Sequence, residues 1–411
     1  MPRFSATPTV ALLTLTLALP TAVARPAAAA PTPTHASVIP SATSSIAASV
    51  APSVRSDTDI RTSLSRPTGP YAVGRDALHL VDHARRDPWV PDTARELMVG
   101  MFYPAFPGTG TPKPYATVRE ARLFLKSYGL EDVFPAETLS ATTTSGRVGA
   151  RPARGRYPLV VLSPGFGVSR FTLTGLAEEL ASRGYVVAAV DHAYESVGTA
   201  FPGGRMLTCV ACANARSEQD MEALTAGRGK DVSFLLDRLT GPRPAWRHAG
   251  LIDLNRIGMA GHSVGGASAA AAMAGDRRIW AGVNIDGAFH AAVPADGLGG
   301  RPFMMLGTDD GTHRPGGTDT SWDQAWDRLD GWKRWLTVAG ATHYSFTDIP
   351  LFLDELGLSG TQSPLVLPGS RSLDISRAYV GAFFGAQLKH TPQPLLDGPT
   401  PTEPEVVFNN P

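Results

Sequence analysis

Residues 256–275 read RIGMAGHSVGGASAAAAMAG and carry the most informative pattern in the chain. Its first five residues are typical of a short apolar strand, and its alanine-rich end is typical of a helix. Between them Gly261, Ser263 and Gly265 form the pattern G-x-S-x-G, in which a serine stands at a sharp turn from strand to helix. Such a turn leaves no room for bulky neighbours, and Gly261, Gly265 and Gly266 supply that room. The stretch therefore predicts a serine facing the N-terminal amides of a helix.

Outside this stretch, apolar runs alternate with segments of helical spacing. The runs expected to form strands are 95–103, 157–162, 185–190, 280–285, 302–306 and 332–338. The segments expected to form helices are 118–128, 173–183, 217–239, 322–329 and 373–388. Continuous apolar runs are typical of strands that are buried on both faces of a parallel sheet. The alternation predicts an α/β fold, a mostly parallel central sheet with helices on both faces.

Composition limits the class of protein. The chain has 411 residues, of which 43% are hydrophobic and 18% charged, and a chain of this size buries about 75% of its unfolded surface. Because 37 basic and 37 acidic residues cancel, no net field favours nucleic acid. The one markedly apolar stretch, Val10–Leu19, is too short to span a membrane.

The N-terminal residues predict export. Arg3 precedes the ten apolar residues Val10–Leu19, and small residues follow, which is typical of a cleaved signal peptide over residues 1–30. Residues 31–67 are mostly Ala, Ser, Thr and Pro, so we expect a disordered leader. The remaining residues, 68–411, are expected to form one catalytic domain.

The chain has two cysteines, Cys209 and Cys212, in a C-x-x-C pattern. In the cytosol this pattern would suggest redox chemistry or half of a zinc site. There is no second cysteine pair, and export favours oxidation. We therefore expect a local disulfide within one loop.

A serine nucleophile needs a base, because its hydroxyl is a weak nucleophile at neutral pH. In the order serine, acid, histidine, the base follows the last strand, where His343 stands in the sequence GATHYSF. His262 is the direct neighbour of Ser263, and its side chain should point away from the base position. We expect His262 to shape the turn or to pack.

The residues alone leave the acid open. Asp286 ends the expected strand 280–285, and Asp309 and Asp310 follow the next strand. Either place suits a carboxylate that orients the imidazole. Spacing slightly favours the later pair.

An oxyanion hole needs two free backbone amides. One should come from Val264, which follows the serine. The other should come from the loop after an early strand, and Phe166 in SPGFG (163–167) is the expected donor.

Residues from other parts of the chain are candidates for the substrate pocket. Segments 106–156 and 192–216 leave the sheet at its C-terminal edge and are expected to line or cover the site. Four aromatic residues are candidates either for an apolar acyl pocket or for ordinary packing: Phe166, Phe201, Phe289 and Tyr344.

These motifs resemble the α/β-hydrolase superfamily and, more narrowly, plasma-type platelet-activating factor acetylhydrolases and their bacterial relatives. The similar segments are GPYAVG (69–74), RELMVGMFYP (95–104), SPGFG (163–167), GHSVGG (261–266), VNIDG (283–287) and ATH (341–343), with Phe346 and Asp348. The resemblance spans residues 68–410, roughly, and implies that Asp286 is the acid. Two positions depart from the family: Pro164 stands where relatives often have His, and Val264 where they often have Phe.

The resemblance implies a secreted serine carboxylester hydrolase that acts through an acyl-enzyme, with short sn-2 acyl groups of phospholipids as substrates. Bacterial relatives also suggest a general lipase or a cutinase-like polyester hydrolase. An acyltransferase with the same triad, a peptidase or amidase, and a binding protein on an inactive scaffold are further hypotheses. The last would lack a triad member. We expect no cofactor or metal and no obligate protein partner, but transient contact with a lipid surface.

Overall fold

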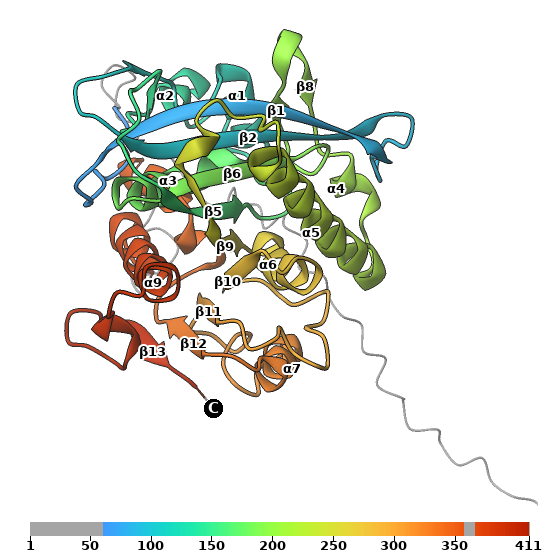
Figure 1. Ribbon diagram of the computed structural model, residues 1–411, viewed down its shortest axis with the longest axis vertical. Coiled ribbons are helices and arrows are strands. Elements are labelled where there is room, and N and C mark those ends of the chain that lie inside the picture. The colour runs from blue at the N-terminus through green and yellow to red at the C-terminus, as the bar shows by residue number, and fades with distance from the viewer. Residues whose placement is uncertain (1–60, 357–365, 411) are drawn as a thin grey trace, which may run out of the picture. The chain divides into compact units, whose positions relative to one another are not determined.

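The computed structural model describes residues 61–356 and 366–410 (Figure 1). The signal peptide predicted at 1–30, and all of the predicted leader up to residue 60, lie outside the described residues.

In this part of the chain, strands β1–β6 and β9–β13 form one sheet in the order β13-β12-β11-β10-β9-β5-β6-β2-β1-β4-β3, and β7 pairs with β8 in a second. The strands are β1 Ala72–Arg86, β2 Ala94–Ala105, β3 Thr111–Pro112, β4 Arg147–Val148, β5 Tyr157–Ser163, β6 Val186–His192, β7 Thr199–Ala200, β8 Met206–Leu207, β9 Ile252–His262, β10 Ile279–Ile285, β11 Phe303–Thr308, β12 Lys333–Val338 and β13 Val406–Phe408. The helices are α1 Val118–Ser127, α2 Ala136–Ser140, α3 Thr174–Ser182, α4 Ala211–Asn214, α5 Glu218–Thr240, α6 Val264–Gly275, α7 Thr320–Arg328, α8 Ile349–Glu355 and α9 Gly369–Lys389.

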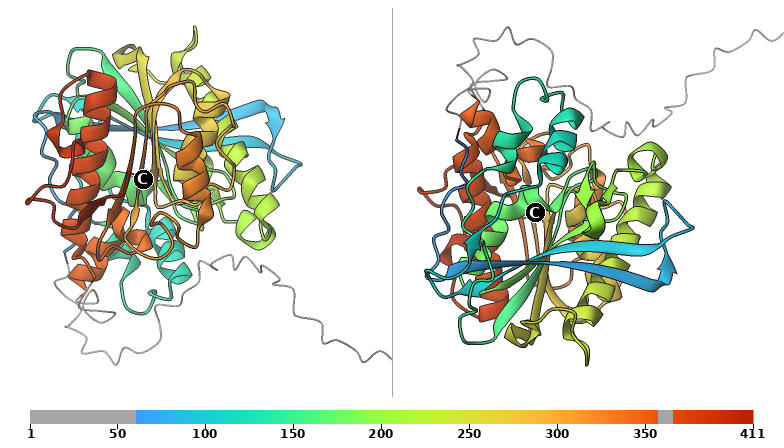
Figure 2. Two further views of the ribbon diagram at one scale, coloured as in Figure 1. Left: turned by 90° about the horizontal axis from the view of Figure 1, so that it is seen from below. Right: turned by 90° about the horizontal axis from the view of Figure 1, so that it is seen from above.

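The middle of the large sheet, from β6 through β5, β9, β10 and β11 to β12, is parallel. The β1–β2 hairpin extends the sheet beyond β6 in antiparallel register, and β13 does so beyond β12. Figure 2 shows α9 on one side of the strands and α5, α6 and α7 on the other. The prediction of a mostly parallel sheet with helices on both faces is confirmed.

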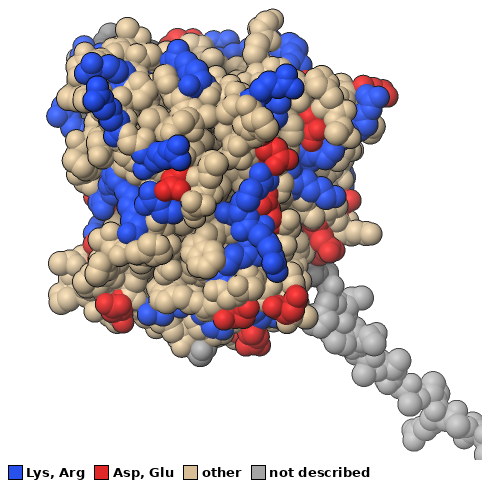
Figure 3. Space-filling model, viewed as in Figure 1, with Lys and Arg blue, Asp and Glu red and all other residues tan. Residues whose placement is uncertain are grey.

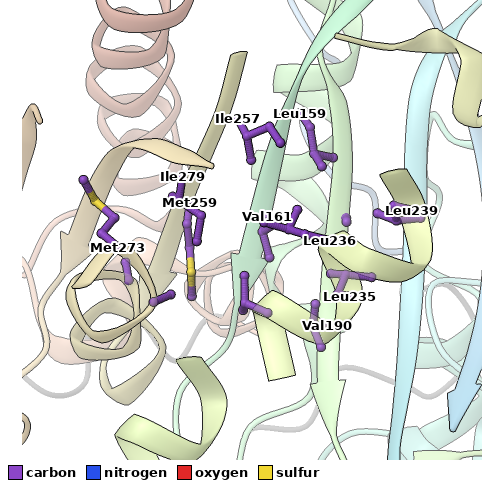
Figure 4. Close-up of a cluster of buried hydrophobic side chains, with 14 of the residues drawn as sticks. Leu159, Val161, Val190, Leu235, Leu236, Leu239, Ile257, Met259, Met273 and Ile279 are labelled. Carbon is purple, nitrogen blue, oxygen red and sulfur yellow. The ribbon is translucent and has the colours of Figure 1, made fainter. Parts of the chain in front are cut away.

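The strand β5 shows why continuous apolar runs form this sheet. Successive side chains of a strand point to opposite faces. Leu159 and Val161 pack in the core beneath α5 and α6, whereas Val160 and Leu162 pack in the core beneath α3 and α9. All four are fully buried. Figure 4 shows the first core, in which strand residues meet leucines of α5 and Met273 of α6. Each such side chain stabilises the fold by about 1.5–3 kcal/mol.

The long strand β1 was not expected from the sequence. Apolar alternation is weak in it because charged side chains occupy inward positions. Arg75 is buried and donates to the backbone oxygens of Pro114 and Tyr115, and Asp82 is buried and pairs with Arg85. These hydrogen bonds replace the apolar contacts that sequence patterns detect.

The predicted end of the leader, after residue 67, is too late. Thr62 and Leu64 are buried, the Leu64 amide donates to the Thr143 oxygen at 3.0 Å, and Arg377 of α9 donates to the Ser65 oxygen. The Ala-, Ser-, Thr- and Pro-rich composition of residues 31–67 gave no sign that the buried side chain of Leu64 anchors this segment.

Charged side chains of both signs are interspersed over the face shown in Figure 3, in keeping with the zero net charge. Within residues 61–356 and 366–410, no helix has both the length and the apolar character needed to cross a bilayer.

Candidate active site

Ser263 stands at the turn between β9 and α6, with φ 56° and ψ −129°. A positive φ in a residue with a side chain costs on the order of 1–3 kcal/mol and is concentrated at functional sites. The turn is tight enough to require glycine. A Cβ on Gly261 would lie 2.2 Å from the Gly265 carbonyl, and one on Gly265 would lie 2.1 Å from the Ser163 oxygen. The Ser263 amide donates to the Ile285 oxygen at 2.7 Å, which ties the turn to β10.

Asp286 and His343 are joined by a hydrogen bond. Asp286 directly follows β10, and His343 lies in a short 3₁₀ helix after β12. His343 Nδ1 lies 2.6 Å from Asp286 Oδ2, and the Thr308 amide donates to Asp286 Oδ1 at 2.7 Å. Burial alone would raise the pKa of Asp286, but the bond from His343, with His313 nearby, lowers it to about 2. The carboxylate is therefore ionised at neutral pH, and His343 donates from Nδ1 to it.

The other two candidate acids have different partners. Asp309 binds Arg314 and the Thr337 hydroxyl, and Asp310 accepts from the hydroxyl of Thr308 and from two amides of its own loop. Of the three carboxylates, only Asp286 contacts His343.

His262 holds the loop that carries His343. Its Nε2 donates to the His343 carbonyl oxygen at 2.7 Å, and the two rings lie 4.6 Å apart between centroids. Burial, and to a smaller extent the nearby His343, lowers the pKa of His262 to about 3. His262 is therefore neutral and structural. The expectation that His262 shapes the turn or packs agrees with this geometry, but the expectation that its side chain points away from the base position is wrong, because it contacts His343.

The hydroxyl of Ser263 makes no hydrogen bond within the described residues, and its side chain is partly exposed. Catalytic hydrogen bonds of this kind often form only when substrate is bound. His343 is likewise open to solvent, with 43% of its side chain exposed, whereas Asp286 is buried. The serine and histidine thus face outward, and the carboxylate lies behind the histidine.

The loop 163–167 lies directly against Ser263. A Cβ on Gly165 would lie 3.3 Å from Ser263 Cβ. In the described part of the chain, neither the Phe166 amide nor the Val264 amide donates a hydrogen bond. Two free amides therefore flank the serine, and the positive end of α6 lies behind one of them. Both amides are therefore candidates for binding a developing oxyanion.

Only two of the four candidate aromatic residues lie beside these groups. The Phe166 side chain packs with Val264, and the Tyr344 ring lies 5.3 Å from the His343 ring. Phe201 instead packs against His79, and Phe289 packs against Trp322 in the main core. Both are buried, and neither makes a ring contact with His343 in the described part of the chain.

Segments 106–156 and 192–216 both reach the site. Tyr128, which follows α1, stacks edge-on against Tyr344 at 5.6 Å. The structure joins Cys209 to Cys212 in a disulfide, and Cys209 packs in the same small apolar cluster as Phe166. Asp348, noted in the histidine loop, is buried and accepts from the Gly175 amide and the Tyr115 hydroxyl, which anchors that loop to α3.

Comparison with known proteins identifies the family. Residues 59–202 match the family "Platelet-activating factor acetylhydrolase, isoform II". A protein of Arthroderma benhamiae named "Probable 1-alkyl-2-acetylglycerophosphocholine esterase" is 30% identical over 380 residues, which cover 84% of this chain and 93% of the relative. The platelet-activating factor acetylhydrolase of Cavia porcellus is 23% identical over 47% of this chain and 49% of its own length.

Among solved structures, a ferulic acid esterase from Streptomyces cinnamoneus is similar, with a TM-score of 0.75 and 42% identity. The match covers 84% of this chain and 99% of that one. The shared fold is the α/β-hydrolase fold. From the relative that matches over most of its length, and from the site at the carboxyl ends of the strands, we conclude that this chain is a carboxylic ester hydrolase and belongs to the platelet-activating factor acetylhydrolase family.

Proposed function

We propose that this esterase acts through a catalytic triad of Ser263, His343 and Asp286 and through an acyl-enzyme. The observation that carries this proposal is the 2.6 Å bond between Asp286 and His343 beside a serine held at positive φ. Because Asp286 accepts a hydrogen bond from the Nδ1–H group, the proton of the neutral imidazole stays on Nδ1, and Nε2 is free to accept a proton. His343 is thereby set up as a base.

The reaction then has two halves. His343 Nε2 takes the Ser263 proton as Oγ attacks the ester carbonyl carbon, and the Phe166 and Val264 amides bind the oxyanion. His343 returns the proton to the leaving alkoxide, which leaves an acyl group on Ser263. A water molecule then takes the place of the serine. His343 removes a proton from the water as its oxygen attacks the acyl carbon, and His343 returns that proton to Ser263 Oγ as the carboxylic acid departs.

We propose lipid esters with short sn-2 acyl chains as the substrate class. This rests on the names of the matched relatives, a probable 1-alkyl-2-acetylglycerophosphocholine esterase and a platelet-activating factor acetylhydrolase. The apolar wall made by Phe166 and Val264 suits an acyl chain. General lipase or polyester hydrolase activity, and acyl transfer to an alcohol, use the same triad and remain outcomes of the experiment below.

Esters of aromatic acids are the second candidate. The Streptomyces ferulic acid esterase is 42% identical to this chain, more than any relative named above. In this chain Tyr344 and Tyr128 lie edge to face beside His343. Aromatic rings that pair in this way offer a surface for a planar aromatic acid.

The experiment compares purified residues 61–411 on p-nitrophenyl acetate, octanoate and palmitate, an sn-2-acetyl phospholipid and methyl ferulate. Ser263→Ala is the control and should lose on the order of 10⁴–10⁶-fold in kcat. The substrate profile assigns the class, and capture of the acyl group by an added alcohol would reveal transfer. A Ser263→Ala variant that keeps the wild-type rate would refute the triad.

We also propose that the enzyme is secreted. The predicted signal peptide at 1–30 supports this, and the Cys209–Cys212 disulfide suits an oxidising compartment. Expression of the full chain in a secreting bacterial host should release protein that begins after residue 24 or within residues 27–30, measured by N-terminal sequencing. Retention of intact Met1 in the cytosol would contradict the proposal.

A further inference from the structure

A cluster of buried charged and polar side chains lies against the loop that carries Phe166. We name it the Arg228 cluster. Its members are Arg95 of β2, His192 of β6, Glu195, and Arg228 and Asp231 of α5. The exposed fraction of each is 2% or less. None of them belongs to the proposed triad, so the triad chemistry does not explain why charges are buried here.

The charges of the cluster are paired with one another. Arg228 Nε donates to Glu195 Oε2 at 2.8 Å, and Arg95 donates to Glu195 Oε1 at 2.5 Å and to Asp231 Oδ2 at 2.7 Å. Burial would raise the pKa of Glu195, but Arg95 and Arg228 outweigh it and lower that pKa. Burying such charges carries a desolvation penalty that ion pairing often only offsets, so the cluster is weak evidence for stability alone.

The cluster binds the loop 163–167, which carries the proposed oxyanion donor Phe166 and which we name the oxyanion loop, at three of its five residues. Arg228 Nη1 donates to the Pro164 oxygen at 2.6 Å. The Gly167 amide donates to the backbone oxygen of Glu195 at 3.0 Å. These contacts hold the loop on both sides of Phe166, whose amide stays free.

The third contact is a buried array of Ser163, His192 and Asp231. His192 Nδ1 lies 2.7 Å from Asp231 Oδ2, and His192 Nε2 lies 3.1 Å from Ser163 Oγ. Burial lowers the pKa of His192, so its ring is neutral, donates to Asp231 and accepts from Ser163. Ser163 is fully buried, so no substrate reaches it. This array orients the loop and is not a second catalytic site.

The contact with Pro164 has an electrostatic consequence at the active site. A Cβ on Gly265 would lie 2.7 Å from the Pro164 oxygen, so this oxygen lies next to the start of α6 and to Val264. A carbonyl oxygen carries partial negative charge, which opposes an oxyanion nearby. The Arg228 guanidinium fixes the direction of this carbonyl and compensates its charge.

We infer that Arg228 is a positioning residue of the oxyanion hole. It acts through the Pro164 carbonyl to keep the Phe166 amide directed at the position that the oxyanion occupies. The inference rests on the proposed function, because it takes Ser263 as the nucleophile and Phe166 as an oxyanion donor.

The test compares Arg228→Met and Arg228→Lys with Arg238→Met, a matched control at an exposed position of the same helix. Each is measured for kcat and KM on p-nitrophenyl acetate and for inhibition by an aryl trifluoromethyl ketone, which forms an anionic tetrahedral adduct with the serine. Arg228→Met should lower kcat and raise the inhibition constant of the ketone in parallel, each by about 10²-fold, which is the effect of losing one oxyanion donor. KM should change by less than about threefold. Arg228→Lys should recover part of both, and Arg238→Met should match wild type.

A folded Arg228→Met enzyme with wild-type kcat would overturn the inference. So would a lower kcat without weaker ketone binding, because a merely structural role lowers the amount of active enzyme and leaves the inhibition constant unchanged. If Arg228→Met does not fold by circular dichroism, Arg228→Lys decides on the same two readouts. Failure of the proposed function is distinguished by Ser263→Ala, which would then keep both the wild-type activity and the wild-type inhibition by the ketone.

Discussion

At the scale of single residues, Asp286 determines the chemical state of His343. Its two oxygens accept hydrogen bonds from His343 Nδ1 and from the Thr308 amide, so the carboxylate is held in one orientation. Like Ser263, Asp286 has a positive φ, 58°. Both residues are thus held in a strained backbone conformation at the same edge of the sheet, which is where strain is expected to serve function.

Replacing Asp286 should prevent His343 from acting as a base. In Asp286→Asn, the amide would donate to Nδ1 and leave the proton on Nε2, the wrong tautomer for accepting the serine proton. We expect kcat to fall by roughly 10⁴-fold, measured on p-nitrophenyl acetate. The matched control is Asp309→Asn, which alters the hydrogen bonds to Arg314 and Thr337 and leaves the contacts of His343 unchanged. A larger loss at 309 than at 286 would show that the acid is assigned wrongly.

His262 gives a prediction about stability and pH. Its folded pKa of about 3 lies below the unfolded value of 6.5, so the unfolded chain binds a proton that the folded chain excludes. The stability from neutral His262 is therefore complete above pH 6.5 and is lost as the pH falls toward 3. His262→Gln keeps a donor for the His343 oxygen and does not titrate.

We expect the stability advantage of wild type over His262→Gln to shrink between pH 7.5 and 4.5 by on the order of 2 kcal/mol. Urea unfolding at several pH values measures it, and His192 titrates equally in both proteins. Curves that stay parallel over this range would mean that His262 does not exclude the proton.

At the scale of elements, the contact between α6 and the end of β5 brings together the two segments that we propose form the oxyanion hole. Gly265 lets the first turn of α6 approach the carbonyls of Ser163 and Pro164. This approach places Val264, at the helix N-terminus, beside the loop that carries Phe166. The close distance between the helix and the loop therefore depends on the absence of a Cβ atom at Gly265.

Gly265→Ala should therefore separate the two elements. Its new Cβ would meet the Ser163 oxygen at 2.1 Å, so the backbone must move. We expect kcat to fall by at least about 10²-fold, as for loss of one oxyanion donor. Gly275→Ala at the other end of α6 is the control, because nothing lies within 4 Å of its Cβ. Kinetics and thermal melting are measured on both, and equal activities would contradict this role of Gly265.

At the scale of the whole molecule, the chain before β1 completes the fold. Leu64 packs in the core formed by α1, α2, α8 and α9, and the backbone beside it binds Thr143 on both sides. Figure 2 shows α1 and α2 next to the segment after β12, which holds His343. The same small core therefore supports one side of the active site.

We expect Leu64→Ala to lower the free energy of unfolding by about 2–5 kcal/mol, the usual cost of truncating a buried leucine. Leu254→Ala is the matched control, since Leu254 is 51% exposed, and it should change stability by less than about 0.5 kcal/mol. Chemical denaturation measures both. Equal small effects would indicate that residues 61–67 contribute nothing to the folded state.

The parallel strands, the helices between them and the serine turn could be predicted from the amino-acid sequence, because they follow from local patterns. A strand buried on both faces needs a continuous apolar run, as in β5, and the turn needs glycine at 261 and 265. The β1 hairpin strand was missed because Arg75 and Asp82 are charged residues at buried positions. The partners of Arg75, the backbone oxygens of Pro114 and Tyr115, lie outside the strand, and Asp82 pairs with Arg85 within it.

Which side chains meet at the ends of the strands follows from the three-dimensional fold and not from local patterns. Asp286 and Asp309 follow neighbouring parallel strands, β10 and β11, so spacing cannot distinguish them, whereas the fold brings only Asp286 to His343. The contact of His262 with His343, and that of Arg228 with Pro164, join residues 81 and 64 positions apart. Local patterns report what each segment buries, but the direction of a side chain at a sheet edge depends on segments far away in the chain.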